Sequence, residues 1–361
     1  ASVNGGGIGT KNLVINGAMQ IAQRATSQAS ITSSGYYNLD RYRTFLTTGQ
    51  VTTSQSTDVP TGEGFTNSFK VDVTSAASMG VNDLLGVQQR IEAQNLQMLN
   101  YGTSGAKTIT LSFFVKSNKT GTYCVALEKP DNTRYDFVSE YTISSANTWE
   151  KKTITIAPDS NIQASAGAID NDNGIGFGLK FMLATGSDRD NATNNTWNTG
   201  GGTVLSTSNQ VNLLDSTSNE WYVTGVQLEV DHTGSGVATD FEHRSFGQEL
   251  ALCQRYYYLH VEGDQENIGV GAYYNSSLCA FSVEFPVAMR AAPSLDYVSG
   301  AGYYQVYRNN ASDTFSAMTM PRSNTNAAAI DTTSGTSGTE GVAGILGTAN
   351  AGAYIAFNAE L

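Results

Sequence analysis

Most of this chain alternates apolar and polar residues with a period of two, and this period constrains the fold more than any other feature. Between Lys107 and Lys116 every second residue is apolar: Ile109, Leu111, Phe113 and Val115. Successive side chains of a strand point to opposite faces of a sheet, so such a segment buries one face. The pattern recurs within 123–127, 154–156, 175–183, 222–230, 281–285 and 355–361, with turn residues between. Many short strands of this kind predict an all-β protein built as a β-sandwich.

One segment breaks the period. Leu250, Cys253 and Tyr257 are spaced i, i+3 and i+7, which places them on one face of a helix. We predict a helical neck over 246–258 whose seam packs against a sheet or against copies of the same chain. The neck divides the chain into an arm (1–10), a large β-domain (11–245) and a smaller C-terminal β-domain (259–361). Residues 1–10 lack the basic and apolar parts of a secretory signal, so we expect a flexible arm.

The composition excludes several classes of partner. Charged residues make up only 14% of the 361 residues, and the formal net charge is -12. This charge opposes the phosphate neutralisation on which nucleic-acid binding depends, and it disfavours anionic membrane surfaces as well. No apolar run approaches the roughly 18 residues needed to cross a bilayer. We therefore expect a protein with a neutral polar surface, without nucleic acid and without membrane insertion.

The three cysteines predict free thiols. Cys124, Cys253 and Cys279 are an odd number without a Cys-x-x-Cys pair, which argues against a disulfide framework and against structural zinc. Free, buried thiols are the simplest interpretation, and a single bridge between Cys253 and Cys279 is the alternative.

The sequence offers little for catalysis. It has no Gly-x-Ser-x-Gly elbow, no His-Glu-x-x-His pair and no Walker loop. The run Asp170–Gly174 resembles a calcium loop but lacks its terminal glutamate, so a polar turn is favoured. His243 is interpreted as a hydrogen-bonded joint residue rather than a base. A glycosidase needs two carboxyl groups, and two pairs of acids lie close together in the sequence: Asp188 with Asp190, and Asp264 with Glu266. We interpret these acids as solvated loop residues. We predict no catalytic residue, no metal and no cofactor.

Aromatic side chains among amides are the best candidates for a binding site. Sugars stack their apolar faces on flat rings, while amides bond their hydroxyl groups. The candidate glycan-binding residues are Trp197 and Asn195 in a long polar loop, and Tyr303, Tyr304 and Tyr307 in the C-terminal domain. The alternative for the tyrosines is packing in a core or subunit contact, and for Trp197 it is folding back onto its own domain.

Several short sequence motifs together resemble those of the tail-fibre and receptor-binding proteins of tailed bacteriophages. They span nearly the whole chain: Asn12–Arg24, Asp40–Tyr42, Gln89–Glu92, Thr224–Val230, Phe241–Arg244, Glu249–Tyr257 and Phe285–Pro293. The resemblance implies a carbohydrate-binding-module-like jelly roll for 11–245 and a distal β-domain after the neck. The sequence departs from the group at two places. Ala18-Met19 stands where an acidic residue and Phe are common, and Tyr42 stands where Trp is common.

The resemblance further implies a structural virion protein, made in the host cytoplasm, that acts as a homotrimer. Its partners would be its own copies, other virion proteins and a host cell-surface polysaccharide. Two alternatives stay open: a polysaccharide depolymerase on the fibre, and a purely structural head-fibre or decoration protein without a receptor. The motifs themselves are interpreted as scaffold, because they do not point to a ligand pocket.

Overall fold

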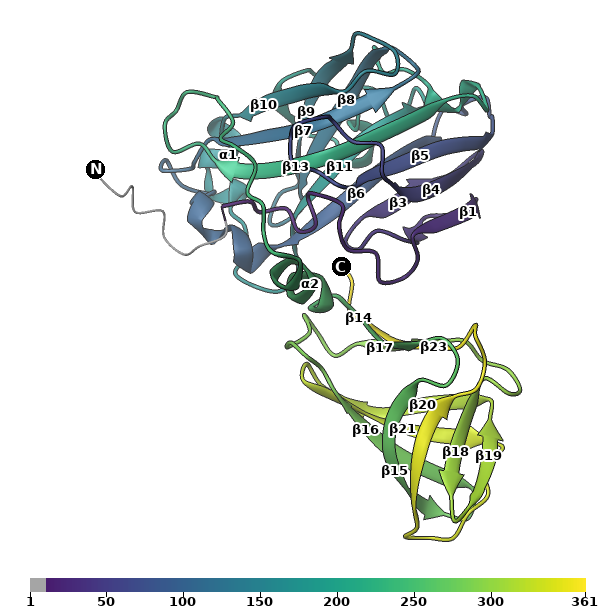
Figure 1. The fold of residues 1–361 in the computed structure, drawn as a ribbon. Helices are drawn as coiled ribbons and strands as arrows, with labels where there is room; N and C mark the ends of the chain where they lie inside the picture. Colours follow the sequence, from purple (N-terminus) through teal and green to yellow (C-terminus); the bar gives the residue numbers. More distant parts are fainter. Residues whose placement is uncertain (1–10) are drawn as a thin grey trace. The chain divides into compact units, whose positions relative to one another are not determined.

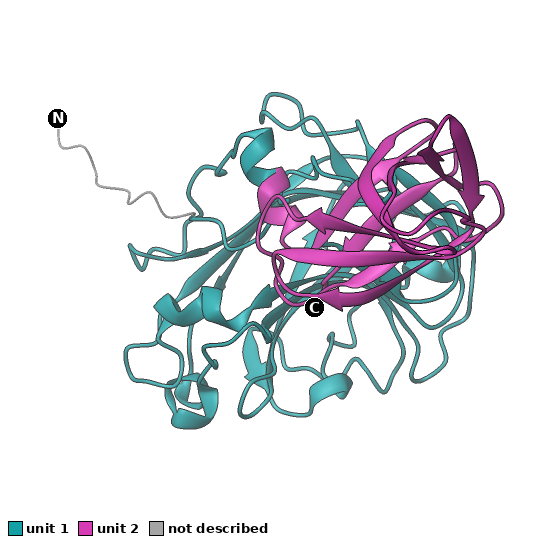
Figure 2. Ribbon diagram, turned by 90° about the horizontal axis from the view of Figure 1, so that it is seen from below, with its two compact units in different colours: residues 1–249, 361 teal, residues 250–360 magenta. Residues whose placement is uncertain are grey.

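The computed structural model describes residues 11–361, and these residues form two compact units (Figure 2). Unit 1 runs to Glu249 and includes Leu361, and unit 2 comprises Leu250–Glu360. Within the described residues no helix has the length and apolar character that a membrane span requires.

Unit 1 consists of two antiparallel sheets with a shared core (Figure 1). In order across the first sheet the strands are β1 (Ser27–Ile31), β4 (Gln50–Ser56), β5 (Ser68–Ser75), β13 (Glu220–Val230), β7 (Ile109–Ser117) and β10 (Glu150–Ile156). Across the second sheet they are β12 (Thr196–Asn198), β9 (Tyr135–Ile143), β8 (Gly121–Lys129), β11 (Ile175–Thr185), β6 (Leu84–Glu92), β3 (Arg43–Leu46) and β2 (Gly35–Tyr36). The predicted all-β sandwich is confirmed.

The alternation identified the inward side chains of β7 correctly. Ile109, Leu111, Phe113 and Val115 are all fully buried between the two sheets. The opposite face of β7 is buried as well, which a half-buried strand would not show. There the ring of Phe114 lies 5.6 Å from that of Phe65, in a small separate apolar cluster. A loop therefore covers the face that the pattern assigned to solvent.

The motifs that carry the phage resemblance hold the N-terminal segment onto the sandwich. The Asn12 side chain donates to the carbonyl of Val226 (3.0 Å) and accepts from the amide of Leu228 (3.0 Å). The backbone amide of Asn16 donates to the Glu249 carboxylate at 2.5 Å. Asn12 and Asn16 are buried, so these bonds replace water around groups that would otherwise be unsatisfied. These motif residues serve the scaffold.

Unit 2 contains two further antiparallel sheets around one core. The smaller sheet has the order β14 (Tyr257–Glu262), β23 (Tyr354–Asn358) and β17 (Ser294–Tyr297). In order, the larger sheet has β19 (Ala311–Phe315), β18 (Tyr304–Arg308), β22 (Ala343–Thr348), β15 (Asn267–Asn275), β16 (Leu278–Glu284), β21 (Ala327–Ser334) and β20 (Ala317–Ser323). The final alternating segment of the chain is thus a strand, β23, and it lies at the centre of its sheet.

The predicted helical neck is shorter than its spacing indicated. Helix α2 spans Phe246–Gln254, and Tyr257 is the first residue of β14, where it pairs with Asn358. The run Tyr256–Tyr258 is aromatic and favours a strand, which ends the helix. Tyr257 and Cys253 are buried within the chain, while Leu250 is half-buried. The prediction that Leu250, Cys253 and Tyr257 line one helical face is therefore wrong, because Tyr257 lies on a strand.

All three cysteines are free and buried. This confirms the prediction of free thiols and removes the alternative bridge between Cys253 and Cys279. Burial raises the pKa of the Cys124 thiol, which keeps it protonated and unreactive at neutral pH.

A buried lysine fastens two loops of unit 1. The Lys129 ammonium donates to the carbonyls of Asp131 (2.6 Å), Ala166 (3.1 Å) and Ala168 (3.2 Å). Burial lowers the pKa of Lys129 to about 8, so the charged form still predominates at pH 7. One cation thus satisfies three carbonyl groups from the two segments that meet there.

Replacing Lys129 should measurably destabilise unit 1. In Lys129→Met the three carbonyls lose their donor, and we expect a loss of about 1–3 kcal/mol. Tryptophan fluorescence during thermal unfolding reports this directly, because all three tryptophans lie in unit 1. Lys119→Met is the matched control, since its partner Asp215 lies at the surface and such pairs contribute little. Equal unfolding midpoints for the two variants would contradict the assignment.

Candidate functional site

Trp197 is a core residue of unit 1 and does not face solvent. Its side chain is only 3% exposed, and its indole Nε1 donates to the carbonyl of Ala157 at 3.0 Å. Its ring lies 5.5 Å from Phe137 and 6.0 Å from Tyr101. The cause is that Thr196–Asn198 adds to the sheet as β12, where Trp197 pairs with Phe137. The interpretation of Trp197 as a glycan-stacking residue is wrong.

Asn195 lies on the same loop and serves the loop itself. It adopts a left-handed backbone conformation with φ of 55°, and its side-chain oxygen accepts from Ser139 Oγ at 2.7 Å. The neighbouring Asn194 accepts from the backbone amide of Glu140 at 3.0 Å. These amides are therefore engaged in holding the loop against β9.

The three candidate tyrosines of unit 2 differ in their exposure to solvent. Tyr304 is fully buried, and its hydroxyl lies within hydrogen-bond distance of the carbonyls of Tyr354 (2.7 Å) and Val298 (2.9 Å). Tyr304 is thus a core residue, and its assignment to a glycan site is wrong. Tyr303 is half-buried, and its ring lies near Gly300. Tyr307 is 43% exposed.

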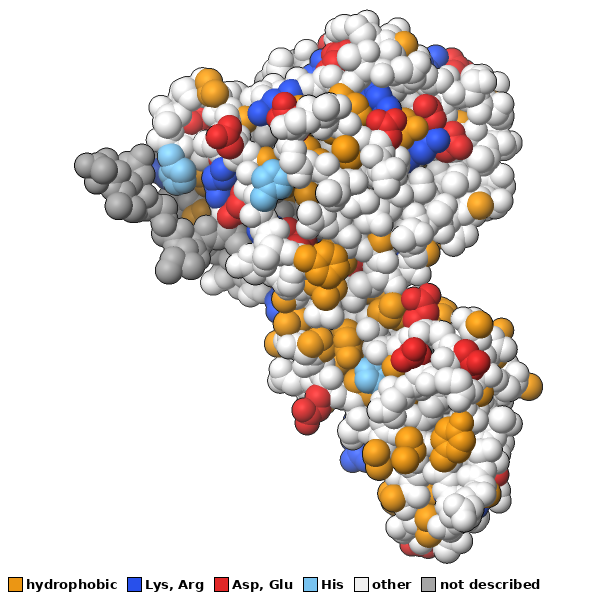
Figure 3. All heavy atoms as spheres, viewed as in Figure 1, with side chains coloured by type: hydrophobic (Ala, Val, Ile, Leu, Met, Phe, Trp, Pro, Cys, Tyr) orange, Lys and Arg blue, Asp and Glu red, His pale blue; other side chains and the backbone are white. Residues whose placement is uncertain are grey.

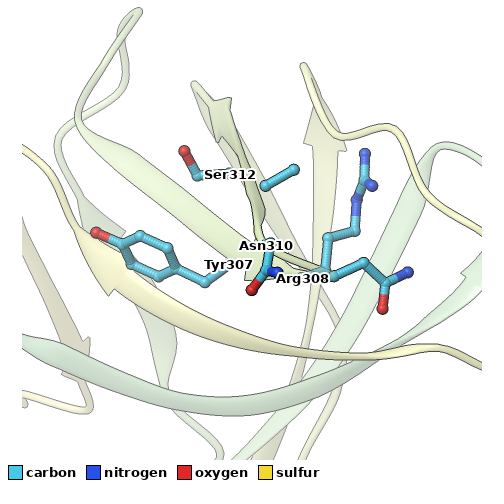
Figure 4. Close-up of a pocket in the computed structure, with 6 residues that line it drawn as sticks. Tyr307, Arg308, Asn310 and Ser312 are labelled. Carbon is cyan, nitrogen blue, oxygen red and sulfur yellow. The ribbon is translucent and has the colours of Figure 1, made fainter.

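Tyr307 lies at the end of a tight hairpin between β18 and β19. Asn309 and Asn310 form the turn with φ of 45° and 59°, and two successive positive values are typical of a two-residue hairpin loop. Tyr307 pairs across the hairpin with Ser312. Figure 4 shows both side chains extending to one side of the hairpin, with Arg308 on the other. The hairpin therefore presents the phenol ring outward.

Arg308 is neutralised on the inner side of the same hairpin. Its guanidinium contacts Asp313 Oδ2 at 2.7 Å and the Tyr273 hydroxyl at 3.2 Å. The hydrogen bond to Tyr273 and the charge of Asp313 raise the pKa of Arg308. The positive charge nearest to Tyr307 is therefore already paired.

Tyr307 begins a row of exposed apolar side chains on the outer face of the larger sheet. It pairs with Ile345 of β22, and Ile345 pairs with Val270 of β15. Cross-strand partners point to the same face, and Ile345 and Val270 are 55% and 68% exposed. Figure 3 shows hydrophobic side chains gathered over the part of unit 2 where Figure 1 places β15, β22 and β18. We call Tyr307, Ile345 and Val270 the apolar row.

The Tyr307 ring lies close to Gly347 of β22. A Cβ on Gly347 would stand 3.9 Å from the ring atom Cε2 of Tyr307. This distance is an ordinary van der Waals contact, so the ring lies over β22 at Gly347. One ring therefore borders two shallow depressions of the surface.

Polar groups flank the ring in both depressions. The first, at the hairpin tip, is lined by Tyr307, Arg308, Asn309, Asn310, Ala311 and Ser312. The second has a volume of about 130 Å³ and is lined by Tyr307 with Gln265, Glu266, Asn267, Gln305, Ile345, Leu346, Gly347 and Thr348. Glu266 is the single carboxylate among these lining residues. An exposed ring bordered by amides and hydroxyls has the composition of a saccharide site.

The sequence identified Tyr307 but not its neighbours Ile345 and Val270. The one available signal was the adjacent pair Ile345-Leu346, since two consecutive residues of a strand face opposite sides. Leu346 is buried, so Ile345 has to lie on the outer face. Without knowing whether that face was covered, the sequence could not mark it as exposed.

The sequence also gave no sign of a second aromatic surface, which lies in unit 1. Its aromatic and charged side chains pair with one another. A row across the first sheet pairs Lys116 with Tyr222, and Tyr222 with Lys70. The Trp149 indole donates to Asp58 at 2.9 Å, and the same carboxylate pairs with the Lys116 ammonium. These groups satisfy one another, so we do not assign a ligand to them.

Of the remaining candidates from the sequence, Glu266 lines the second depression, whereas His243 and the segment Asp170–Gly174 belong to unit 1. His243 contacts the rings of Phe65 and Phe241 in unit 1. In the segment Asp170–Gly174, the Asp172 side chain accepts from the Gly174 amide at 2.8 Å, as in a polar turn. Within residues 11–361, no three His, Cys, Asp or Glu side chains lie close enough together to hold a metal ion.

No protein-family model matches the sequence, and no curated protein sequence matches it significantly. Solved structures align with part of the chain. Tailspike protein 4 of bacteriophage CBA120, in its enzymatically active domain, aligns at 14% identity and a TM-score of 0.30, covering 61% of this chain and 21% of that chain. A putative sugar-binding protein from Bacteroides thetaiotaomicron aligns at 13% identity and a TM-score of 0.31, with coverages of 61% and 100%.

A family 11 carbohydrate-binding module from Clostridium thermocellum, solved with a mixed-linked tetrasaccharide, aligns at 14% identity and a TM-score of 0.27. That alignment covers 57% of this chain and 95% of the module. The chain thus spans about a fifth of the tailspike domain but nearly the full length of the other two. At this level of similarity the alignments assign neither ligand nor activity to this chain.

Proposed function

We propose that this chain is a non-catalytic glycan-binding protein of a phage fibre, and that the surface around Tyr307 contacts a host polysaccharide. The observation that carries the proposal is the exposed Tyr307 ring between two depressions lined by amides and hydroxyls. A pyranose stacks its C–H face on such a ring, and the flanking groups bond its hydroxyls. The virion role rests on the sequence resemblance to tail-fibre proteins.

The charge around the ring supports a neutral ligand. Arg308 is paired with Asp313, which leaves no free cation among the lining residues of either depression. Glu266 is an exposed carboxylate, and the whole chain carries a formal charge of -12. Acidic polysaccharides would be repelled, so the glycan should carry no net negative charge.

The same surface does not supply the groups of a glycosidase. That chemistry uses two carboxyl groups on either side of the scissile bond, and Glu266 is the single carboxylate lining the depressions. The depolymerase alternative therefore needs a different site. Its test is incubation of the purified protein with host polysaccharide, followed by an assay for new reducing ends. Sustained release of reducing ends would replace binding by catalysis as the function.

Binding itself is tested on an array of bacterial surface polysaccharides probed with the labelled full chain. We expect saturable binding to neutral glycans and weak binding to acidic ones. Labelled protein is also applied to whole host cells. Saturation on cells supports receptor binding, and its absence would favour a purely structural head-fibre or decoration protein.

We further propose that the protein acts as a homotrimer on the virion. Weak sugar contacts repeated on one assembly raise the avidity by orders of magnitude without any new contact, since later contacts become intramolecular. Mass photometry of the purified chain should show a species of three chain masses that persists at nanomolar concentration. A monomer at micromolar concentration would contradict this part and leave single-site binding intact. Cys253 and Tyr257 are buried within the chain, so we do not propose them as trimer contacts.

A further inference from the structure

The residues beside Tyr307 carry a feature that general saccharide binding does not require. Stacking and hydroxyl recognition need one ring and several polar groups, yet Ile345 and Val270 continue the surface as aliphatic side chains. Both are more than half exposed. Exposed apolar side chains that adjoin one another across strands mark a surface that contacts something apolar.

The geometry of the sheet sets the spacing between the Cβ atoms of neighbouring residues in the apolar row. Directly opposed residues of antiparallel strands have Cβ atoms about 5 Å apart. Ile345 is one such step from Tyr307, and Val270 is a second step in the same direction. One step is about the width of a pyranose ring. Tyr307 and Ile345 also line the same depression, so a sugar stacked on Tyr307 would extend a substituent to Ile345.

Polar groups border the apolar row at its side but do not interrupt it. Gln265, Glu266 and Asn267 line the depression on the β15 side, and Ser312 lies beyond Tyr307 on β19. A hydroxyl or hydroxymethyl group in contact with the Ile345 side chain would lose water to a group that forms no hydrogen bond, which is costly. A methyl group at the same position would gain by its burial.

From this arrangement we propose that the site selects a neutral sugar that carries a methyl group beside its stacked face. The shared chemistry is a methyl next to a pyranose ring, and it has two sources: the C6 methyl of a 6-deoxyhexose or the acetamido methyl of an N-acetylhexosamine. This inference rests on the proposed function and narrows its ligand class.

The test compares sugars that differ at the methyl position, using the full chain. In one arm methyl α-L-rhamnoside competes against methyl α-L-mannoside, which has a hydroxymethyl group in place of the methyl. In the other arm N-acetylglucosamine competes against glucose. Burial of one methyl is worth about a fourfold difference in affinity, so one arm should show about that preference. Saturation-transfer NMR should give its strongest ligand signal at the methyl protons.

Ile345→Ser should remove the preference in that arm while the matched hydroxymethyl or unsubstituted sugar binds as before. Val81→Ser is the control, because Val81 is also an exposed apolar residue but lies in unit 1. Retention of the preference in Ile345→Ser would overturn the assignment of the row.

The outcomes separate this inference from the proposed function. If sugars bind in a Tyr307-dependent way without any methyl preference, the inference fails and the proposed function stands. If no saccharide binds at all, both fail. A second copy of this chain could occupy the apolar row instead of a sugar, and mass photometry of Ile345→Ser tests this. If the variant loses an oligomer that the unchanged chain forms, copies of the chain contact each other through the row. That result would also overturn the inference.

Discussion

Tyr307→Ala should weaken glycan binding by about thirtyfold while the protein stays folded, because truncating an aromatic residue that dominates an interface costs about 2 kcal/mol or more. The ring is exposed and lies over Gly347, so its removal leaves the core of unit 2 intact. Tyr307→Phe keeps the stacking surface and should retain most of the affinity. The measurement is the dissociation constant for the best ligand of the polysaccharide array.

The matched control for Tyr307→Ala is Tyr274→Ala. Tyr274 is on β15 of the same sheet and is 74% exposed, but it lines neither depression. Its removal should leave the affinity unchanged. Equal losses for the two variants would mean that neither ring is the specific contact, and an unchanged affinity in Tyr307→Ala would place the glycan site elsewhere.

The second large effect concerns stability. Trp197→Ala should destabilise unit 1 by about 3–5 kcal/mol, as expected for truncation of a buried aromatic residue that leaves a cavity. The variant loses the contacts with Phe137 and Tyr101 and the hydrogen bond to Ala157. For a unit of this size the melting temperature should fall by about 10 °C. Trp149 and Trp221 remain as fluorescent reporters of unit 1.

Glycan binding provides the decisive comparison for Trp197. In the folded fraction of Trp197→Ala the affinity should equal that of the unchanged chain, since the Tyr307 surface lies in unit 2. Trp197→Phe should lose less stability, because most of the ring contact persists. A variant with unchanged stability but lost binding would restore the original interpretation of Trp197 as a ligand contact.

The two variants also show how far sequence reasoning reached at the candidate site. Trp197 and Tyr307 are both aromatic residues among amides, and the sequence treated them alike. Trp197 becomes buried because three residues of its loop pair with β9, a contact between positions about 60 residues apart. Tyr307 stays exposed because nothing among the described residues covers that face of β18. Loop composition carries no information about such a distant pairing.

The end of the neck helix has a similar explanation. The spacing of Leu250, Cys253 and Tyr257 fits a helix, and α2 does form over its first part. Beyond Gln254 the helix does not continue, because Tyr257 pairs with Asn358 in a sheet. Asn358 lies about 100 residues further along the chain. A local period cannot weigh that competing pairing.

The sequence by itself determined the all-β class and the inward residues of strands such as β7. These follow from side-chain alternation and composition, which are local properties. Only the tertiary structure decided that Tyr304 is buried while Tyr307 is exposed, and that Ile345 and Val270 continue the surface beside it. The physical reason is that a two-residue period assigns residues to one face or the other, whereas the cover over each face comes from segments distant in the chain.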